Sequence, residues 1–243
     1  MEKEWFASWF DSPYYPMLYR HRDEEEAKKA LTNLHSKLSL PTGSTVLDLG
    51  CGQGRHSRTL RSLGYTVVGI DLSPSSIAKA NELASEGERF EVQDMRTFAV
   101  TERFDAVFNL FTSFGYFDDH DDNLRVLTQI AAHLHPSGTL VLDYLNAFPL
   151  LTQDEQEATH RVDQVVFHTH KKREGDSIVK YIEVHDGDET FHFRERVQLI
   201  TLNQFQSILT AAGFTITEVF GNYELESYIP EVSPRCLIIA RKS

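Results

Sequence analysis

Residues 45–54 of the chain read TVLDLGCGQG, an apolar run that leads directly into three closely spaced glycines. The apolar run predicts a buried strand, and the residues after Gly54 predict a helix, so the glycines form the turn between the two. Glycine permits a sharp turn and lets a ligand approach the backbone without hindrance from a Cβ atom. A turn of this kind, between a strand and a helix, is where α/β folds bind nucleotides.

A carboxylate ends the next predicted strand. Residues 65–71 read YTVVGID, which places Asp71 about 20 residues after Gly50. A carboxylate at this position can accept hydrogen bonds from the two ribose hydroxyls of an adenosine group. The combination of strand, glycine turn, helix and acid therefore predicts a site for an adenosine-containing cofactor.

Two positions distinguish among such cofactors. The dinucleotide motif G-x-G-x-x-G requires glycine at position 55, where this chain has Arg55. Asp48 lies just before the glycines and would repel a pyrophosphate, whereas it would attract the ammonium and sulfonium groups of S-adenosylmethionine. We therefore expect S-adenosylmethionine, and a nicotinamide-dependent oxidoreductase is disfavoured. In the plainer alternative, Asp48 only caps the turn and the glycines only form it.

Strands and helices alternate along most of the chain. Five strands are predicted before residue 146, and a helix with a capping box at Thr201 precedes two more. Apolar strands separated by helices predict a doubly wound α/β fold, with a mostly parallel seven-stranded sheet covered on both faces. The predicted strands are residues 45–49, 65–71, 89–93, 104–110, 139–144, 214–220 and 236–240.

Residues 147–200 follow a different pattern, in which we expect three strands between residues 161 and 200. Turn-like clusters at 174–176 and 186–188 would make two hairpins, and Phe191, Phe193, Val197 and Leu199 alternate with polar residues. So short a segment has too little core to be stable alone. We therefore expect an S-adenosylmethionine-binding domain of residues 1–146 and 201–243, and a small antiparallel β insertion of residues 147–200 that acts as a lid or wall over the acceptor site.

At these motifs the chain resembles class I S-adenosylmethionine-dependent methyltransferases, which have a Rossmann-like fold. Residues 46–54 resemble their first motif, residues 68–73 their second, residues 93–95 their third and residues 104–110 their fourth. Within that family, the added strands and the aromatic leader are similar to small-molecule N-methyltransferases that act on amino sugars or glycine. The resemblance implies transfer of a methyl group from S-adenosylmethionine to a small-molecule acceptor, with nitrogen favoured over oxygen.

The resemblance also implies which residues surround the cofactor. Asp71 would hold the ribose, Asp94 would face the adenine amino group and Met95 would line the adenine ring. Leader tyrosines often close over the cofactor in such enzymes, although leader aromatics can also simply pack on the domain. The candidate cofactor-binding residues are Tyr15, Tyr19, Asp48, Gly50, Gly52, Asp71, Leu72, Asp94, Met95, Asn109 and Leu110.

Methyl transfer from a sulfonium is a direct displacement, so the protein must align the acceptor and exclude water rather than supply a nucleophile. Tyr116 and His120 follow the fourth predicted strand and are candidates to contact or deprotonate the acceptor. The alternative is an aromatic loop that only packs and a solvated histidine. No catalytic residue is otherwise indicated.

Composition limits the partners. The net charge of -12 argues against affinity for a nucleic-acid backbone, and Asn109 does not begin the Asn-Pro-Pro-aromatic motif of nucleic-acid methyltransferases. His168 and His170 share a strand face but lack accompanying acidic or cysteine ligands, so we expect no metal. Neither a secretory signal nor an apolar run of membrane-spanning length is visible, and we expect a cytoplasmic protein, monomer or homodimer. The remaining alternative is a non-catalytic cofactor-binding module that contacts a protein partner.

Overall fold

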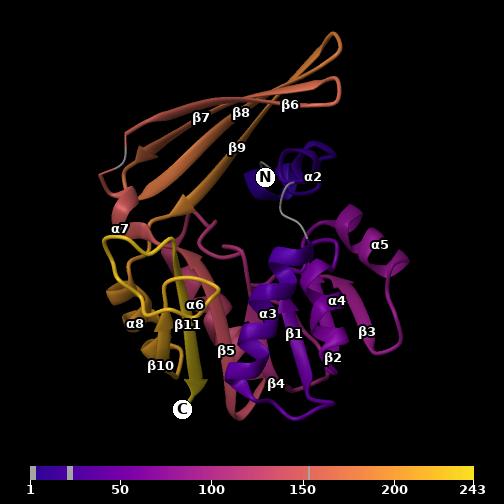
Figure 1. Cartoon of the computed structure of the whole chain (residues 1–243), viewed down its shortest axis with the longest axis vertical. Helices are drawn as coiled ribbons and strands as arrows, with labels where there is room; N and C mark the ends of the chain where they lie inside the picture. The colour runs from indigo at the N-terminus through magenta and orange to yellow at the C-terminus, as the bar shows by residue number, and fades with distance from the viewer. Residues whose placement is uncertain (1–3, 21–23, 153) are drawn as a thin grey trace.

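The computed structural model describes residues 4–20, 24–152 and 154–243, and these fold around two separate β-sheets (Figure 1). The larger sheet has seven strands in the order β10-β11-β5-β4-β1-β2-β3. Its strands are β1 (Thr45–Leu49), β2 (Thr66–Asp71), β3 (Glu88–Val92), β4 (Phe104–Asn109), β5 (Leu134–Leu145), β10 (Phe214–Phe220) and β11 (Arg235–Lys242).

Most neighbours in this sheet are parallel. Strand β1 pairs in parallel with β2 and β4, β2 with β3, and β4 with β5, whereas β11 runs antiparallel to both β5 and β10. The predicted doubly wound, mostly parallel seven-stranded sheet is therefore confirmed. The carboxyl ends of β1, β2, β4 and β5 meet at one edge, where ligands bind in folds of this class.

Helices cover both faces of the large sheet because its strands bury side chains on both sides. Val46 of β1 packs with apolar residues of α3 and α4, and the next residue, Leu47, packs in the cluster that contains α6 and α8. A further helix, α5, packs on β3. These helices are α3 (Glu24–Leu38), α4 (Arg55–Ser62), α5 (Pro74–Glu82), α6 (His120–His133) and α8 (Leu202–Ala211). The capping box predicted at Thr201 is present.

The smaller sheet has four antiparallel strands; the three expected between residues 161 and 200 are present, and one that was not predicted comes before them. They are β6 (Gln156–Val162), β7 (Val165–Glu174), β8 (Ser177–Asp186) and β9 (Glu189–Gln198), in that order. The two predicted hairpins are present, but a third joins β6 to β7. The turn of this hairpin contains no glycine to mark it, and Asp163 there adopts a left-handed φ of 55°. Strand β6 itself is largely exposed and polar. Strand β6 therefore lacks the apolar alternation that reveals a strand in sequence.

A leader of two short helices, α1 (Trp5–Trp9) and α2 (Tyr14–Leu18), lies between the two sheets (Figure 1). The Trp9 ring is fully buried and lies 4.8 Å from the ring of Phe193 in β9, measured between centroids. On the opposite side of the leader, the Phe6 and Phe117 centroids are 5.8 Å apart. The leader aromatics thus form an apolar layer that joins the small sheet to the α/β unit.

A one-turn helix, α7 (Ala147–Leu150), links β5 to the small sheet. Asn146 caps it by accepting a hydrogen bond from the backbone N–H of Phe148 at 3.2 Å. Within the described ranges, the structure contains no helix with the length and apolar character needed to cross a membrane.

Candidate active site

The glycine turn after β1 is held in a conformation that suits glycine. Gly50, Gly52 and Gly54 have φ values of 78°, 52° and 77°, all in the left-handed region. The backbone N–H of Gly50 donates to the carbonyl of Ile70 at 2.8 Å, which fixes the turn against β2. A Cβ atom at Gly52 would meet no protein atom within 4 Å, so the backbone there is open to a ligand.

Asp71 lies at the end of β2, directly beside this turn. Its Oδ2 accepts a hydrogen bond from the Gly52 N–H at 2.8 Å, and its Oδ1 accepts one from the Ser73 N–H at 2.9 Å. Burial raises the pKa of this carboxyl above its usual value, although the backbone donors act against that shift. Each carboxylate oxygen keeps unused acceptor capacity. A ribose could therefore bind Asp71 without displacing the backbone donors.

A cavity of about 100 Å³, which we call the cofactor cavity, opens between the glycine turn and the leader. Seven of the candidate cofactor residues line it, namely Tyr15, Gly50, Gly52, Asp71, Leu72, Asp94 and Met95. An adjoining cavity of about 280 Å³ shares Tyr15, Gly50 and Gly52 and adds two further candidates, Tyr19 and Leu110. The open backbone at Gly52 and the carboxylate of Asp71 both face this space, and they fit an adenosine cofactor.

Two of the candidate residues lie beneath the turn instead. The Asp48 side chain is 1% exposed and accepts a hydrogen bond from the Ser57 hydroxyl at 2.6 Å. Burial raises the pKa of Asp48 to about 6, with a smaller contribution from Asp71. Asn109 is fully buried and donates to the carbonyls of Leu49 and Ser113. In the structure these two side chains support the turn from below.

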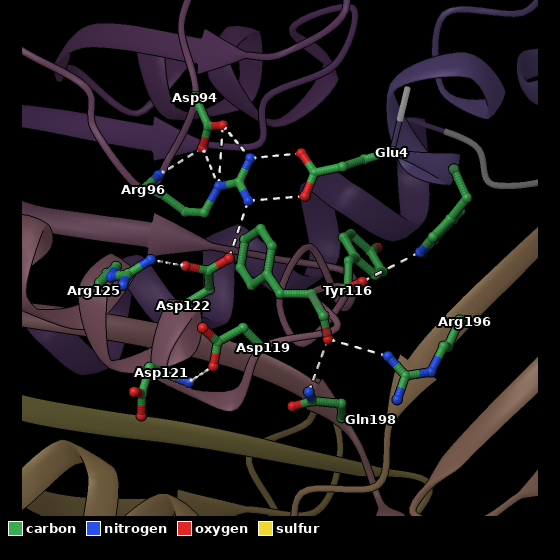
Figure 2. A network of polar contacts seen from close by, with 12 residues as sticks. Glu4, Asp94, Arg96, Tyr116, Asp119, Asp121, Asp122, Arg125, Arg196 and Gln198 are labelled. Carbon is green, nitrogen blue, oxygen red and sulfur yellow. Dashed lines mark hydrogen bonds and ion pairs between the residues drawn. The ribbon is translucent and has the colours of Figure 1, made fainter. Parts of the chain in front are cut away.

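Asp94 lines the cavity but also binds Arg96, a residue that the sequence reasoning missed. Figure 2 shows the Arg96 guanidinium between three carboxylates, those of Asp94, Glu4 and Asp122, at 2.6, 2.7 and 3.0 Å. Burial alone would raise the pKa of Asp94, but the hydrogen bonds from Arg96 hold it below its usual value. Arg96 therefore ties the third motif to the leader and to the start of α6.

A larger cavity, of about 590 Å³, adjoins the cofactor cavity on the side of the small sheet. Phe10, Tyr15 and Tyr116 line both, so these aromatic rings lie at the boundary where the two cavities adjoin, which we call the passage. We call this larger space the acceptor cavity. Residues 147–200 contribute much of its wall, including Lys171, Ile178, Lys180, Glu195 and Val197.

The structure separates the two acceptor-side candidates. Tyr116 lies at the passage, where its ring packs edge-on against Trp5 with centroids 5.6 Å apart. His120 lies at the start of α6, with a side chain 68% exposed and 3.0 Å from Asp176. It lines a different surface pocket, at the first residue of α6, which Asp119 caps.

Four histidines of the small sheet, His168, His170, His185 and His192, lie on its outer face, whereas His160 of β6 is directly opposite Phe167 on the inner face. His168 and His185 stack edge-on at 5.3 Å between centroids, and His185 also contacts Glu183 at 2.7 Å. Among the side chains that the structure describes, no group of three or more His, Cys, Asp or Glu is arranged to hold a metal ion.

Comparisons with known proteins show that the fold is that of S-adenosylmethionine-dependent methyltransferases. A family model described as a methyltransferase domain matches residues 19–219, and the chain belongs to that family. The dTDP-3-amino-3,6-dideoxy-alpha-D-glucopyranose N,N-dimethyltransferase of Streptomyces fradiae is 31% identical over 207 residues, 81% of this chain and 78% of that protein. The protein is an S-adenosylmethionine-dependent methyltransferase.

Two solved structures are similar over nearly the whole chain. An S-adenosylmethionine-dependent methyltransferase from Clostridium acetobutylicum superposes with a TM-score of 0.80 at 20% identity, covering 94% of this chain and 96% of that one. CalS10, an amino pentose methyltransferase from Micromonospora echinaspora solved with S-adenosylmethionine bound, gives a TM-score of 0.71 at 25% identity, covering 96% and 98%.

Proposed function

We propose that this methyltransferase transfers a methyl group from S-adenosylmethionine to an amine nitrogen of a small molecule such as an amino sugar. The observation that carries the proposal is that Phe10, Tyr15 and Tyr116 line both the cofactor cavity and a second cavity that adjoins it. Two similar proteins support the choice of nitrogen, since the Streptomyces fradiae relative is an N,N-dimethyltransferase of an amino sugar and CalS10 methylates an amino pentose.

Methyl transfer mainly requires the protein to align the acceptor with the methyl group of the cofactor. When bound, S-adenosylmethionine supplies a methyl group on a positively charged sulfur, and the acceptor nitrogen forms its bond to carbon as the sulfur–carbon bond breaks. Phe10, Tyr15 and Tyr116 would exclude water from the passage and direct the acceptor along one line of approach. Asp71 and the Gly52 backbone would fix the cofactor at the other end of that line.

We also propose that residues 147–200 form the wall of the acceptor site, rather than an independent domain. Ile178 and Val197 of this segment line the acceptor cavity, and Val197 packs against residues of the β5–α7 connection. On the inner face of the segment, Phe193 also packs against Trp9 of the leader. A segment that shares its core with the leader and the α/β unit positions the acceptor without folding alone.

The test is a methyl-transfer assay with labelled S-adenosylmethionine and three acceptors: glucosamine, glycine and glucose. We expect transfer to at least one of the two amines and none to glucose. Tyr116→Ala should lower kcat/KM by about tenfold or more because the passage loses its wall, whereas His120→Ala, which alters an exposed side chain outside the passage, should retain full activity. Transfer to glucose alone, or equal losses in the two variants, would contradict the proposal.

A further inference from the structure

Three charged residues form a row across the inner face of the small sheet. Lys171 of β7 lies directly opposite Lys180 of β8, and Lys180 lies directly opposite Glu195 of β9. Side chains at such positions in an antiparallel pair lie on the same face with Cβ atoms about 5 Å apart. All three line the acceptor cavity.

The single carboxylate of this row is already engaged. Glu195 accepts hydrogen bonds from the Trp9 indole at 2.8 Å and the Tyr19 hydroxyl at 2.7 Å, and it forms an ion pair with Lys180 at 3.1 Å. Lys180 also contacts the Tyr19 hydroxyl and lies 4.9 Å from the centre of the Tyr19 ring. Lys180 is thus held in place, and Glu195 neutralises one of the two lysines.

Lys171 is left without compensation. Burial lowers the pKa of its amine, and the like charge of Lys180 lowers it further. Among the side chains that the structure describes, none forms an ion pair with Lys171. Like charges directly opposite each other in a sheet are destabilising, so a bound anion would stabilise this arrangement.

The other charged residues of the acceptor cavity do not change this balance. Arg235 is paired with the buried carboxylate of Asp143 at 2.8 Å. Glu231 is exposed and does not contribute to the pKa shift of Lys171. The half-buried region around Lys171 therefore carries an excess of positive charge, inside an otherwise acidic protein.

We propose that Lys171 binds an anionic group, a phosphate or a carboxylate, on the methyl acceptor, and that this contact selects among amines. The inference rests on the proposed function, in that it assigns part of the acceptor cavity to one chemical group. An ammonium binds a phosphate or carboxylate through short, charge-assisted hydrogen bonds. Such an anion would also relieve the repulsion between Lys171 and Lys180.

Calorimetry on the protein loaded with S-adenosylhomocysteine tests the contact directly. Pyrophosphate and citrate serve as probes, one for phosphate and one for carboxylate. We expect at least one of them to bind, and Lys171→Met to weaken that binding by about tenfold or more. Lys171→Arg keeps the charge and should retain binding. Because Lys171→Met removes a repulsion, its melting temperature should not fall, which separates loss of the contact from loss of the fold.

Lys172→Met is the matched control. Lys172 is the next residue along β7, faces the opposite side of the sheet and is paired with Glu174 at 3.1 Å. Its substitution removes the same charge without altering the acceptor cavity, so anion binding should be unchanged. Equal binding by the two Met variants, or no binding of either probe to the wild-type protein, would overturn the inference.

Transfer assays with glucosamine, glucosamine 6-phosphate and glucosaminic acid extend the test. We expect wild-type kcat/KM to be higher for one of the two anionic amines than for glucosamine, and Lys171→Met to remove that preference through KM. Persistence of the preference in Lys171→Met would overturn the role of Lys171 and leave the amine proposal intact. Failure to methylate any amine would refute the amine proposal, whereas the calorimetric result would still decide the inference.

Discussion

Arg235 donates a hydrogen bond from Nε to Oδ1 of Asp143 at 2.8 Å, and the Asp143 carboxylate is fully buried between β5 and β11. Its other oxygen accepts hydrogen bonds from the Tyr223 hydroxyl and the Phe111 N–H, both at 2.7 Å. One carboxylate thus joins the last strand to the loop that follows β4, at the edge where the acceptor cavity opens.

That loop is strained. Phe111 and Thr112 have φ values of 55° and 64°, in the left-handed region that side chains with a Cβ atom rarely adopt. Each such residue costs of order 1–3 kcal/mol, which the surrounding contacts must offset. Both residues line the acceptor cavity, and Arg235 also donates to the Thr112 hydroxyl at 2.9 Å. Asp143 therefore fixes the shape of the cavity wall.

Asp143→Asn should lower the free energy of unfolding by about 1–3 kcal/mol, because an amide cannot accept hydrogen bonds on both sides as the carboxylate does. Chemical denaturation measures this change. Glu224→Gln, which alters a surface ion pair with Lys29, should shift stability by less than about 1 kcal/mol. An equally small effect of Asp143→Asn would show that the loop keeps its conformation without the carboxylate.

Gly52→Ala should weaken binding of S-adenosylhomocysteine by about tenfold or more, because the new Cβ atom would project into the space reserved for the ligand. At Gly175, in the turn between β7 and β8, φ is 60° and an added Cβ atom also meets nothing within 4 Å. Gly175→Ala therefore imposes a similar backbone strain, about 1–2 kcal/mol, far from the cofactor cavity. Thermal unfolding of both variants measures the backbone strain, and calorimetry measures how far the added Cβ atom obstructs the ligand. If Gly52→Ala binds as tightly as Gly175→Ala, the turn does not contact the cofactor.

Asp71→Ala should lower the affinity for S-adenosylhomocysteine by about ten- to hundredfold, since it removes charge-assisted hydrogen bonds to the ribose. Asp71 also accepts hydrogen bonds from the backbone N–H groups of Gly52 and Ser73, so its loss could disturb the turn itself. Two ligands that differ only in their ribose hydroxyls are therefore needed to isolate the ribose contact. Calorimetry with 5′-methylthioadenosine and its 2′,3′-dideoxy analogue provides this comparison. The wild-type protein should prefer the first ligand, and Asp71→Ala should bind both equally. A preference that survives in Asp71→Ala would assign the ribose to another residue.

The large sheet and the glycine turn could be predicted from sequence because their signals are local. An apolar run, three glycines and Asp71 in the next strand follow one another within a short stretch, and the topology follows from alternation. The row formed by Lys171 and Lys180 could also have been found. A turn at 175–176 fixes the register of the hairpin, and counting outward from it places these lysines opposite each other.

Arg96 and its partners could not be predicted in this way. Asp94 is a local partner two residues away, but the fold brings Glu4 and Asp122 to Arg96 from distant parts of the sequence (Figure 2). A lone arginine among many charged residues carries no periodicity or spacing that marks such a centre. The separation of His120 from Tyr116 was missed for a related reason. They are close in sequence, but Tyr116 lies in the loop before α6 and His120 is the first residue of that helix, and the two line different pockets.

Asp48 gives the protein a pH-dependent stability with a definite sign. Its pKa is raised by burial from 3.8 to about 6 in the folded state. Between these pH values the folded protein retains a proton that the unfolded chain has lost, so this carboxyl lowers the free energy of unfolding as pH rises through that range. The loss could reach roughly 3 kcal/mol above pH 6. Asp48→Asn keeps an acceptor for Ser57 and removes the titration, so its stability relative to wild type should be higher at pH 7 than at pH 4. Glu82→Gln, on the exposed end of α5, should show no such difference. Denaturation at the two pH values measures the stability of both variants. If the difference in free energy of unfolding between wild type and Asp48→Asn is the same at pH 4 and pH 7, Asp48 is already ionised in the folded protein at pH 4.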